Sequence, residues 1–319
     1  MLLHPIGVMK TNRALLRLIN LPVFSNIYQL AQIIHIAPGI LRKYNGESEN
    51  TYTSFYIDKS DGSKRLIQAP VRELKGLQAW VLRNILDKLN ISPYATAYIE
   101  HRSILDNVTP HRNNRYFICI DLEDFFPSIT RRRVAKLFSR LGYSQKASEI
   151  LAGICTYKGK LPQGAVTSPA LSNIIASKLD RRIAGYTSKR NIIYTRYSDD
   201  ITLSSNNRNA LNQSLSRVIK IIKTEHFRVN NDKLRILGPR RRISVTGLVK
   251  NNTEAKFSIG RRKKRHMRAV IHHHYSGKTK DSVYSSEPSI MGWMAYLKNV
   301  DLESFGKMHQ YLLKLKSAS

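Results

Sequence analysis

Two adjacent aspartates, Asp199 and Asp200, stand between two runs of β-forming residues and constrain the fold more than any other part of the sequence. The runs cover residues 192–197 and 201–204, so only a tight antiparallel turn fits between them. Two carboxylates side by side on such a turn repel each other, which raises the pKa of each unless a cation lies close by. The sequence therefore predicts a hairpin whose turn carries a functional pair of acids.

A third acid, Asp121, ends another apolar run at residues 116–120. Three carboxylates brought together would suit a hard metal ion such as Mg²⁺. Two such ions about 3.5 to 4 Å apart activate an attacking hydroxyl and stabilise a leaving pyrophosphate. The alternative is a solvated turn at Asp199 and Asp200 and a helix N-cap at Asp121, and each residue taken alone fits this alternative equally well.

The charge of the chain restricts its partners. The sequence has 53 Lys and Arg residues against 22 Asp and Glu, a formal net charge of +31. Repulsion of that size opposes a compact fold unless a polyanion neutralises it, which favours a nucleic acid over an acidic membrane surface or a merely basic protein. The excess is steepest between residues 233 and 280, where 15 Lys and Arg accompany one acid, Glu254.

Length, cysteine content and hydropathy exclude several classes of protein. A chain of 319 residues with 42% hydrophobic residues can form one large domain or two or three lobes. Cys119 and Cys155 lack C-x-x-C spacing, so neither a disulfide framework nor a zinc site is expected. We find no signal-peptide pattern and no run of 18 apolar residues, and we therefore expect a cytoplasmic protein with no membrane partner.

Hydrophobic periodicity predicts a mixture of helices and strands. Residues 11–45 have the spacing of two or three short helices, and residues 51–70 alternate as a β-hairpin around a turn at 58–62. An apolar stripe predicts a helix over residues 73–89. Further strands are expected at residues 116–120, 192–197 and 201–204, and further helices at 131–141, 168–184, 208–225 and 261–268.

The three aspartates also lie within a series of motifs that resembles the reverse transcriptase family in order and spacing. The resemblance covers roughly residues 50–260, and an ordered series is far more specific than a lone pair of acids. The motifs are the fingers motif at residues 64–70, the first catalytic motif Ile-Asp-Leu-Glu-Asp-Phe-Phe at 120–126, the template and nucleotide motif Leu-Pro-Gln-Gly-Ala-Val-Thr-Ser-Pro at 161–169, the Y-x-D-D box at 197–200, and the lysine motif Asn-Asn-Asp-Lys at 230–233.

Within that family the sequence is most similar to the retron reverse transcriptases of bacteria. Segments that mark this branch have counterparts at residues 78–86, 103–111 and 245–249. The N-A-x-x-H signature of the branch is present in the second segment with Val108 in place of alanine, and its Y-A-D-D box is present as Y-S-D-D. Both replacements are small in volume and keep the histidine and the acids.

The resemblance implies an α+β fold, a right-hand polymerase with fingers, a palm containing an antiparallel sheet, and a small helical thumb. The length that follows Lys233 leaves room for a thumb but not for a ribonuclease H domain, so none is expected. The expected boundaries are an N-terminal helical extension at residues 1–50, fingers with part of the palm at 51–115, palm with inserted fingers elements at 116–232, and the palm end with a basic helical thumb at 233–319.

The resemblance also implies an activity, RNA-directed DNA polymerisation from dNTPs on a cognate structured noncoding RNA. DNA would start from an internal 2′-hydroxyl of that RNA and form a branched RNA–DNA hybrid (msDNA), in antiphage defence with a separate effector protein. Two alternatives are a group II intron-like reverse transcriptase, which would ordinarily have a longer region after the thumb, and a non-catalytic RNA-binding scaffold, which would not need three aspartates.

The resemblance assigns the metal chemistry to one group of residues. Asp121 and Asp199 would hold two Mg²⁺ ions, Asp200 would support them, and the carbonyl of Leu122 would be a further ligand. The two acids that follow Leu122 are expected to be solvated or to cap a helix.

Two further groups of residues would contact substrates. Side chains and backbone around the incoming dNTP would bind its triphosphate, exclude a ribose 2′-hydroxyl and approach the template base. Stem and loop contacts to the RNA are expected mainly from the basic C-terminal segment, where His266 and His272 to His274 fit an RNA contact or plain surface better than a metal site. The nucleotide group is Lys64, Arg65, Phe126, Gln163, Gly164 and Lys233, and the RNA group is Asn107, His111, Val245, Thr246, Gly247, Arg261, Arg262, Lys264 and Arg265.

Overall fold

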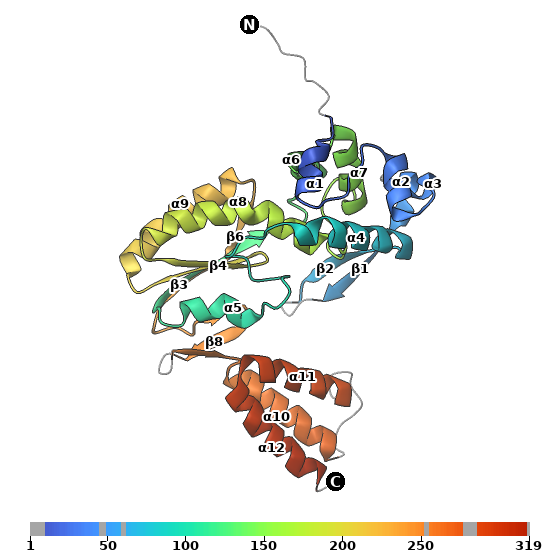
Figure 1. Ribbon diagram of the computed structural model, residues 1–319. Coiled ribbons are helices and arrows are strands. Elements are labelled where there is room, and N and C mark those ends of the chain that lie inside the picture. Colours follow the sequence, from blue (N-terminus) through green and yellow to red (C-terminus); the bar gives the residue numbers. More distant parts are fainter. Residues whose placement is uncertain (1–9, 45–48, 59–61, 252–254, 277–285, 318–319) are drawn as a thin grey trace.

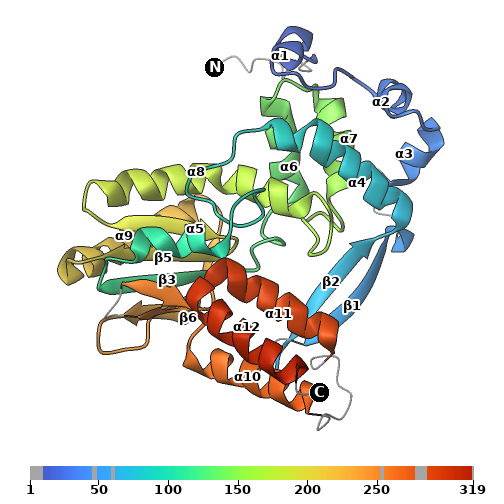
Figure 2. The same ribbon diagram turned by 60° about the horizontal axis from the view of Figure 1, so that its bottom comes forward.

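The computed structural model describes residues 10–44, 49–58, 62–251, 255–276 and 286–317. A mixed body of helices and sheets carries the N-terminal four fifths of the chain, and a group of three C-terminal helices stands apart from it at the bottom of Figure 1. In the view of Figure 2 these three helices lie in front of the body, between its sheet and the β1–β2 hairpin.

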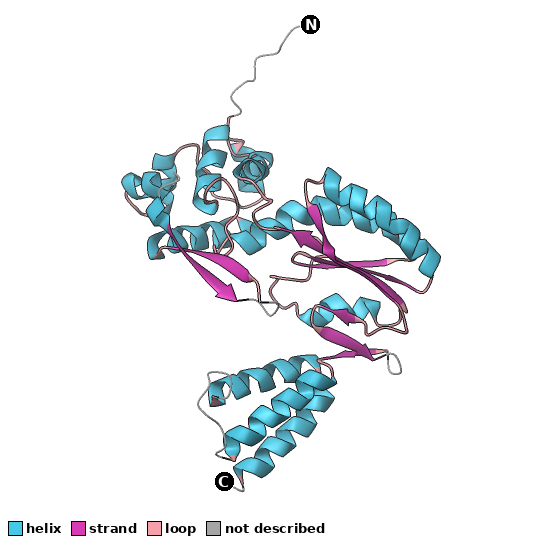
Figure 3. Ribbon diagram, turned by 180° about the vertical axis from the view of Figure 1, so that it is seen from behind, coloured by secondary structure: helices cyan, strands magenta, loops and turns pink. Residues whose placement is uncertain are grey.

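A four-stranded antiparallel sheet, called the palm sheet below, forms the centre of the body. Its strand order is β4-β5-β3-β6. Helices α8 and α9 pack along one face, as Figure 3 shows from behind. The elements are β3 (Tyr116–Glu123), α8 (Ser168–Ser188), β4 (Ile193–Tyr197), β5 (Asp200–Ser205), α9 (Arg208–Thr224) and β6 (Arg228–Leu237).

The central strand β3 is apolar from Tyr116 to Ile120 because both of its faces are buried there. Ile118, Ile120 and Leu122 belong to the larger hydrophobic core, which includes residues of α8 and α9. Phe117 and Cys119 point to the other side and belong to a second core, which includes residues of the C-terminal helices. The alternation of side chains along a strand therefore joins two cores through one element.

The second core connects the palm sheet to the C-terminal helices, called the thumb helices below. A small antiparallel sheet stands between them in Figure 1. Buried Met267, Ile271, Met294 and Leu297 pack in this core. The elements are β7 (Ser244–Val245), β8 (Leu248–Asn251), β9 (Lys256–Ser258), α10 (Arg261–Tyr275), α11 (Glu287–Val300) and α12 (Leu302–Lys316).

The remaining elements are the helices at the upper right of Figure 1, the β1–β2 hairpin and the segment that follows α4. Asn12 and Asn26 cap the first two helices by accepting backbone N–H groups, which explains where each begins. The elements are α1 (Arg13–Leu18), α2 (Ile27–Ile34), α3 (Pro38–Tyr44), η1 (Glu49–Thr51), β1 (Tyr52–Asp58), β2 (Lys64–Pro70), α4 (Arg72–Asn84), η2 (Leu86–Lys88), α5 (Ile104–Val108), η3 (Thr109–His111), α6 (Arg131–Arg140) and α7 (Gln145–Cys155).

The α+β class with an antiparallel palm sheet is confirmed, as are the β1–β2 hairpin and the strands and helices expected around the acids. The helix expected over residues 73–89 is wrong at its end, because Ile85 leaves helical geometry (φ −125°, ψ −59°) and a 3₁₀ turn follows. Residues 59–61 of the expected turn lie outside the described residues. Within the described ranges no element lies beyond these groups, so they contain no ribonuclease H domain, and none of their helices is long and apolar enough to cross a membrane.

Candidate active site

The three aspartates meet at one end of the palm sheet. Tyr197 pairs with Asp200 across the β4–β5 hairpin, so Ser198 and Asp199 form a two-residue turn, with Ser198 at a positive φ of 59°. Asp121 of β3 pairs with Asp200 of β5 in the strand register. The backbone N–H of Leu122 donates to the carbonyl of Asp199 at 3.0 Å, which fixes the turn against β3. The predicted hairpin and the grouping of its acids with Asp121 are both present.

The electrostatics of this end show an excess of negative charge. Burial, then the charges of Asp199 and Asp121, raise the pKa of Asp200 to about 6. The pKa of Asp199 is also raised, first by burial. The ammonium of Lys233 lies 3.2 Å from Oδ1 of Asp121, and this hydrogen bond raises the pKa of the lysine. The ammonium occupies a position where a cation is favoured. The predicted contact of Lys233 with a nucleotide stays a prediction.

The chemistry of these donors fits a hard divalent cation, since carboxylate oxygens are the ligands that Mg²⁺ takes in proteins. Among the described residues, no three Asp, Glu, His or Cys side chains are arranged closely enough to hold a metal ion without some movement. An added cation would relieve the repulsion that raises the pKa of Asp200.

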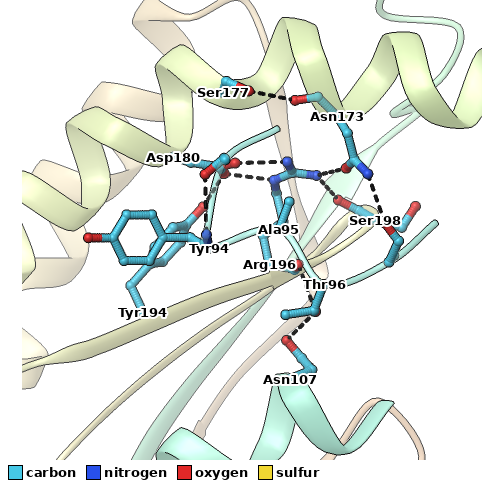
Figure 4. A network of polar contacts seen from close by, with 12 residues as sticks. Tyr94, Ala95, Thr96, Asn107, Asn173, Ser177, Asp180, Tyr194, Arg196 and Ser198 are labelled. Atoms are coloured by element: carbon cyan, nitrogen blue, oxygen red, sulfur yellow. Dashed lines mark hydrogen bonds and ion pairs between the residues drawn. The ribbon is translucent and has the colours of Figure 1, made fainter. Parts of the chain in front are cut away.

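A fully paired network lies directly behind the turn and is drawn in Figure 4. The guanidinium of Arg196, which is completely buried, donates to both carboxylate oxygens of Asp180 at 2.7 and 2.8 Å. Its Nη1 donates to Oδ1 of Asn173 at 3.1 Å and to the carbonyl of Ser198 at 3.0 Å. The hydroxyl of Tyr194 donates to Oδ1 of Asp180 at 2.7 Å. Helix α8 thus holds the backbone of the turn through one arginine.

The same arginine remains charged although it is buried. Burial lowers the pKa of Arg196, but the charge and hydrogen bonds of Asp180 outweigh burial and raise it overall. Asn173 is fixed in turn, because its Nδ2 donates to the carbonyl of Ala97 at 2.7 Å. The partners of the guanidinium are therefore themselves held by hydrogen bonds, as buried polar groups require.

Asn107 and His111 lie on the opposite side of β4 from this network. The amide of Asn107 accepts from the Thr96 hydroxyl at 3.1 Å and donates to the Thr246 hydroxyl at 3.2 Å. His111 forms hydrogen bonds with Ser204 at 2.6 Å and Thr195 at 2.8 Å, and burial lowers its pKa to about 3, so it is neutral.

The prediction that Asn107, His111 and Val245 contact RNA is therefore wrong for their side chains. All three are buried, at 0%, 0% and 1% exposure. The side chains of Asn107 and His111 form their hydrogen bonds with other residues of the chain. The segment at residues 103–111 therefore has a structural role, because its hydrogen bonds connect β4 and β5 to the β7–β8 turn. Thr246 and Gly247 of that turn reach the surface, both with positive φ.

The predicted nucleotide residues flank the acids from the β1–β2 hairpin and the segment after β3. Phe126 is half-buried and packs on Tyr98 with ring centroids 6.1 Å apart. The Tyr98 hydroxyl forms a hydrogen bond of 3.0 Å with the hydroxyl of Ser198 in the acidic turn. Arg65 lies close enough to Tyr98 for its charge to oppose the rise in the tyrosine pKa that burial causes. Lys64 is exposed, opposite Asp58 in the hairpin register.

Gln163 and Gly164 contact the β1–β2 hairpin. The backbone N–H of Gln68 donates to the carbonyl of Gln163 at 2.8 Å. Gly164 has φ +133°, and a Cβ placed there would stand 2.6 Å from the carbonyl oxygen of Gln68. The glycine is thus needed for a close backbone approach, as expected, but the observed partner is strand β2.

The basic residues predicted to bind RNA begin helix α10. Arg261, Arg262 and Arg265 are exposed, whereas Lys264 forms an ion pair of 2.7 Å with buried Asp301 of the α11–α12 junction. The exposed arginines are available to a polyanion. Lys264 primarily holds two thumb helices together.

Sequence reasoning missed Arg196, Asp180 and Arg235. Arg235 on β6 lowers the pKa of Asp200 through its charge. A signal for the first two existed: Arg196 ends an apolar strand, and Asp180 lies one helical turn from buried Ala176 and Ala184 on the apolar stripe of α8. A charge at each of two inward positions indicates a buried pair.

The comparisons with known proteins agree with this geometry. Residues 57–257 match the family model described as reverse transcriptase (RNA-dependent DNA polymerase). The chain is 41% identical over 303 residues to the Retron Ec86 reverse transcriptase of Escherichia coli, covering 94% of this chain and 92% of that protein. It is 32% identical over 305 residues to the Retron Mx65 reverse transcriptase of Myxococcus xanthus, covering 89% and 70%.

A solved structure gives independent support for the fold alone. Telomerase from Candida albicans, in complex with a fragment of telomeric RNA, superposes with a TM-score of 0.50 and 14% identity, over 90% of this chain and 60% of that one. The retron relatives favour the retron branch over the intron-like and scaffold alternatives. The chain therefore belongs to the reverse transcriptase family, in its retron branch, and its activity is RNA-directed DNA polymerisation.

Proposed function

We propose that the chain reverse-transcribes one structured noncoding RNA from its own locus and starts the DNA from an internal 2′-hydroxyl, leaving a branched RNA–DNA product. The observation that carries the proposal is the meeting of Asp121, Asp199 and Asp200 at one end of the palm sheet, in a chain similar to retron enzymes over most of its length. The net charge of +31 supports a large polyanionic substrate.

The acids would hold two Mg²⁺ ions, which supply activation of the attacking hydroxyl and charge neutralisation of the leaving pyrophosphate. Asp121 and Asp199 are the proposed main ligands, with Asp200 in support and the Leu122 carbonyl as a further donor. Arg196 keeps the turn in place by holding the Ser198 carbonyl.

The proposed nucleotide pocket lies between the acids and the β1–β2 hairpin. Arg65 and Lys64 would neutralise the triphosphate, and Lys233 would leave Asp121 to donate to the phosphates. Phe126, held by Tyr98, would block a ribose 2′-hydroxyl. Gly164 would serve the pocket indirectly. It allows close packing against the β1–β2 hairpin, which carries the side chains of Lys64 and Arg65.

The finer surroundings are also proposals. We place the helical extension at residues 1–50, fingers and part of the palm at 51–115, the main palm at 116–232 and the palm end with the thumb at 233–319. Residues Thr246, Gly247, Arg261, Arg262 and Arg265 are proposed RNA contacts. We also propose a bacterial cytoplasmic location and a separate effector protein in antiphage defence, and the likeness to retron enzymes supports both proposals.

The experiment uses the purified protein with RNA transcribed from the DNA that flanks the gene, together with Mg²⁺ and dNTPs. The expected product is DNA that stays covalently joined to RNA and is released by an enzyme specific for 2′,5′-branches. A product that needs an added primer, or that has a free 5′ end, would contradict the proposed initiation.

A further inference from the structure

We propose that a basic hollow at the end of the palm sheet remote from the aspartates binds the sugar–phosphate backbone of the RNA, as a site separate from the catalytic centre. The proposal rests on the proposed function, since it assigns part of the RNA to a particular surface.

The hollow lies where β3 begins and β6 ends, beside the start of α9. It measures about 690 Å³. Tyr116, Leu211, Ile236 and Gly238 form part of its lining. Tyr116 and Asp121 stand five residues apart on β3, so the hollow is roughly 17 Å from the acids along the strand.

Four arginines dominate the charge of the hollow, and no carboxylate lines it among the described residues. They come from three separate parts of the chain: Arg115 precedes β3, Arg208 begins α9, and Arg240 and Arg241 follow β6. An arginine cluster with no facing acid is costly through self-repulsion unless an anion is bound there. The planar guanidinium groups suit phosphate oxygens, which they bind in pairs.

A second basic hollow of about 760 Å³ continues the first toward the thumb helices. Arg242 follows Arg241 in sequence, lines the second hollow and approaches Gly260, the N-cap of α10, where a Cβ would stand 3.1 Å from its guanidinium. Lys250 also lines the second hollow and lies near enough to Arg115 for the arginine charge to help lower the lysine pKa, after burial.

The two hollows together form a basic track from the start of α9 to the start of α10. The second hollow adds Arg261, Arg262 and Arg265, the exposed arginines of the first turns of α10. A single phosphate would occupy one hollow, whereas a track that spans both fits a polymer with a charge at every unit. RNA is the polymer that the enzyme copies, so a stem of that RNA outside the primer–template path is the occupant we assign.

The test replaces Arg115, Arg208, Arg240 and Arg241 together by glutamine, which keeps most of each aliphatic stem. The matched control replaces Arg13, Arg17, Arg132 and Arg140 by glutamine, four exposed arginines of α1 and α6 on the far side of the molecule from the thumb helices in Figure 1. Both variants lose the same net charge. Thermal unfolding confirms that each is folded before binding is measured.

The probe is a fluorescent RNA stem-loop with a 20-base-pair stem, titrated by anisotropy at several salt concentrations. The hollow variant should bind it about tenfold more weakly at 150 mM salt, and the slope of log affinity against log salt should fall by about two to three units. The control should stay within twofold of the unmodified protein. Incorporation of dTTP on poly(rA) primed with oligo(dT) should stay within twofold in both variants.

Two results would overturn the proposal. Stem-loop affinity equal to that of the control variant would show that the arginines do not contact RNA. If a folded hollow variant loses both poly(rA)-directed synthesis and stem-loop binding, the hollow lies on the primer–template path and is not a site separate from the catalytic centre. If the unmodified protein does not synthesise DNA on poly(rA), the proposed function is contradicted. The comparison of stem-loop affinity between the two variants still tests whether the hollow binds RNA.

Discussion

Two acidic groups, Asp180 with its partners and the three aspartates of the palm sheet, are connected through Arg196, and they differ in how their charge is balanced. Asp180 is fully buried and meets Arg196 through two short hydrogen bonds and Tyr194 through a third. Asp199 and Asp200 lie beside Asp121, and burial, followed by repulsion between the acids, raises their pKa values. The charge of the first group is balanced within the chain, whereas the second group keeps an excess of negative charge.

The difference shows how a fold can keep an unfavourable cluster in place. Arg196 donates to the carbonyl of Ser198, so the balanced group holds the backbone of the unbalanced one. The Leu122 N–H holds the same turn from β3. Stabilising contacts hold the backbone of the turn on the side of Arg196, whereas the carboxylates of the turn repel Asp121. This pattern is expected where metal binding is part of the function.

The largest effect is expected from the unbalanced group. Asp199→Asn should lower Mg²⁺-dependent dNTP incorporation at least about a thousandfold, because loss of one carboxylate removes a ligand whose charge neutralisation the reaction needs. Asp121→Asn should do the same. RNA affinity, measured by anisotropy, should be unchanged, since the basic surface is intact.

Asp124→Asn is the matched control, because the exposed carboxylate of Asp124 forms an ion pair of 3.8 Å with Arg228. It should keep at least half of the activity. Synthesis by Asp199→Asn within tenfold of the unmodified protein would remove this residue from the metal site.

Breaking the balanced group should mainly affect stability. Arg196→Met leaves Asp180 buried without its cation and should lower the free energy of unfolding by about 3 to 5 kcal/mol, measured by urea denaturation. The double variant Arg196→Met with Asp180→Leu should lose less than the sum of the single variants, because neither charge is then left unpaired.

Activity separates structural from positioning roles for Arg196. At a temperature where the double variant is folded, its rate of incorporation should still be reduced about 10- to 100-fold, since the Ser198 carbonyl has lost its donor. The loss should be in kcat more than in KM for dNTP. Full activity of the folded double variant would show that the network stabilises the fold without positioning the turn.

A smaller, opposite effect on stability is expected from Asp200→Asn in the absence of divalent metal. At pH 7 Asp200 is ionised in both states, but ionisation costs more in the folded state because its pKa there is about 6 instead of 3.8. The variant should therefore be more stable by about 1 to 3 kcal/mol above pH 6, after allowance for solvent screening.

The gain should shrink as pH falls from 6 and vanish below about 3.8, where the carboxyl is protonated in both states. Saturating Mg²⁺ should reduce the gain at pH 7, because the cation stabilises the ionised cluster of the unmodified protein. A gain that does not depend on pH would show that Asp200 is not strained by its neighbours.

The smallest effect concerns selectivity on the open side of the acids. Phe126→Ala should raise the use of ribonucleotides relative to deoxynucleotides about tenfold, because the ring would no longer fill the space beside the sugar 2′ position. The ratio of kcat/KM values for dCTP and CTP measures it. An unchanged ratio, in a folded variant, would show that Phe126 only packs on Tyr98.

The unbalanced group of acids could be predicted from sequence better than the balanced group. Asp121, Asp199 and Asp200 interrupt apolar strands at points where a turn or strand end must follow, and they lie in motifs that resemble those of the reverse transcriptase family. The hairpin and the strand pairing follow from alternation, so the meeting of the acids follows as well.

The buried polar contacts around the balanced group join residues that are distant in sequence, and hydrophobic periodicity does not predict such contacts. Asn107 and His111 were expected on an RNA surface, yet they are buried and their partners Thr246 and Ser204 lie 139 and 93 residues away in sequence. Strand β6 was not predicted, because it is an outer strand whose residues are mostly exposed and polar.

Counting bound ions tests the central claim most directly, because the aspartates are claimed to form a site for two metals. Mn²⁺ can be titrated by electron paramagnetic resonance into the complex of the protein with a primed template and a non-reacting dNTP analogue. We expect two tightly bound ions per unmodified protein, and at most one in a variant with Asp121→Asn and Asp199→Asn together. Two ions retained at full affinity by that double variant would contradict the claim.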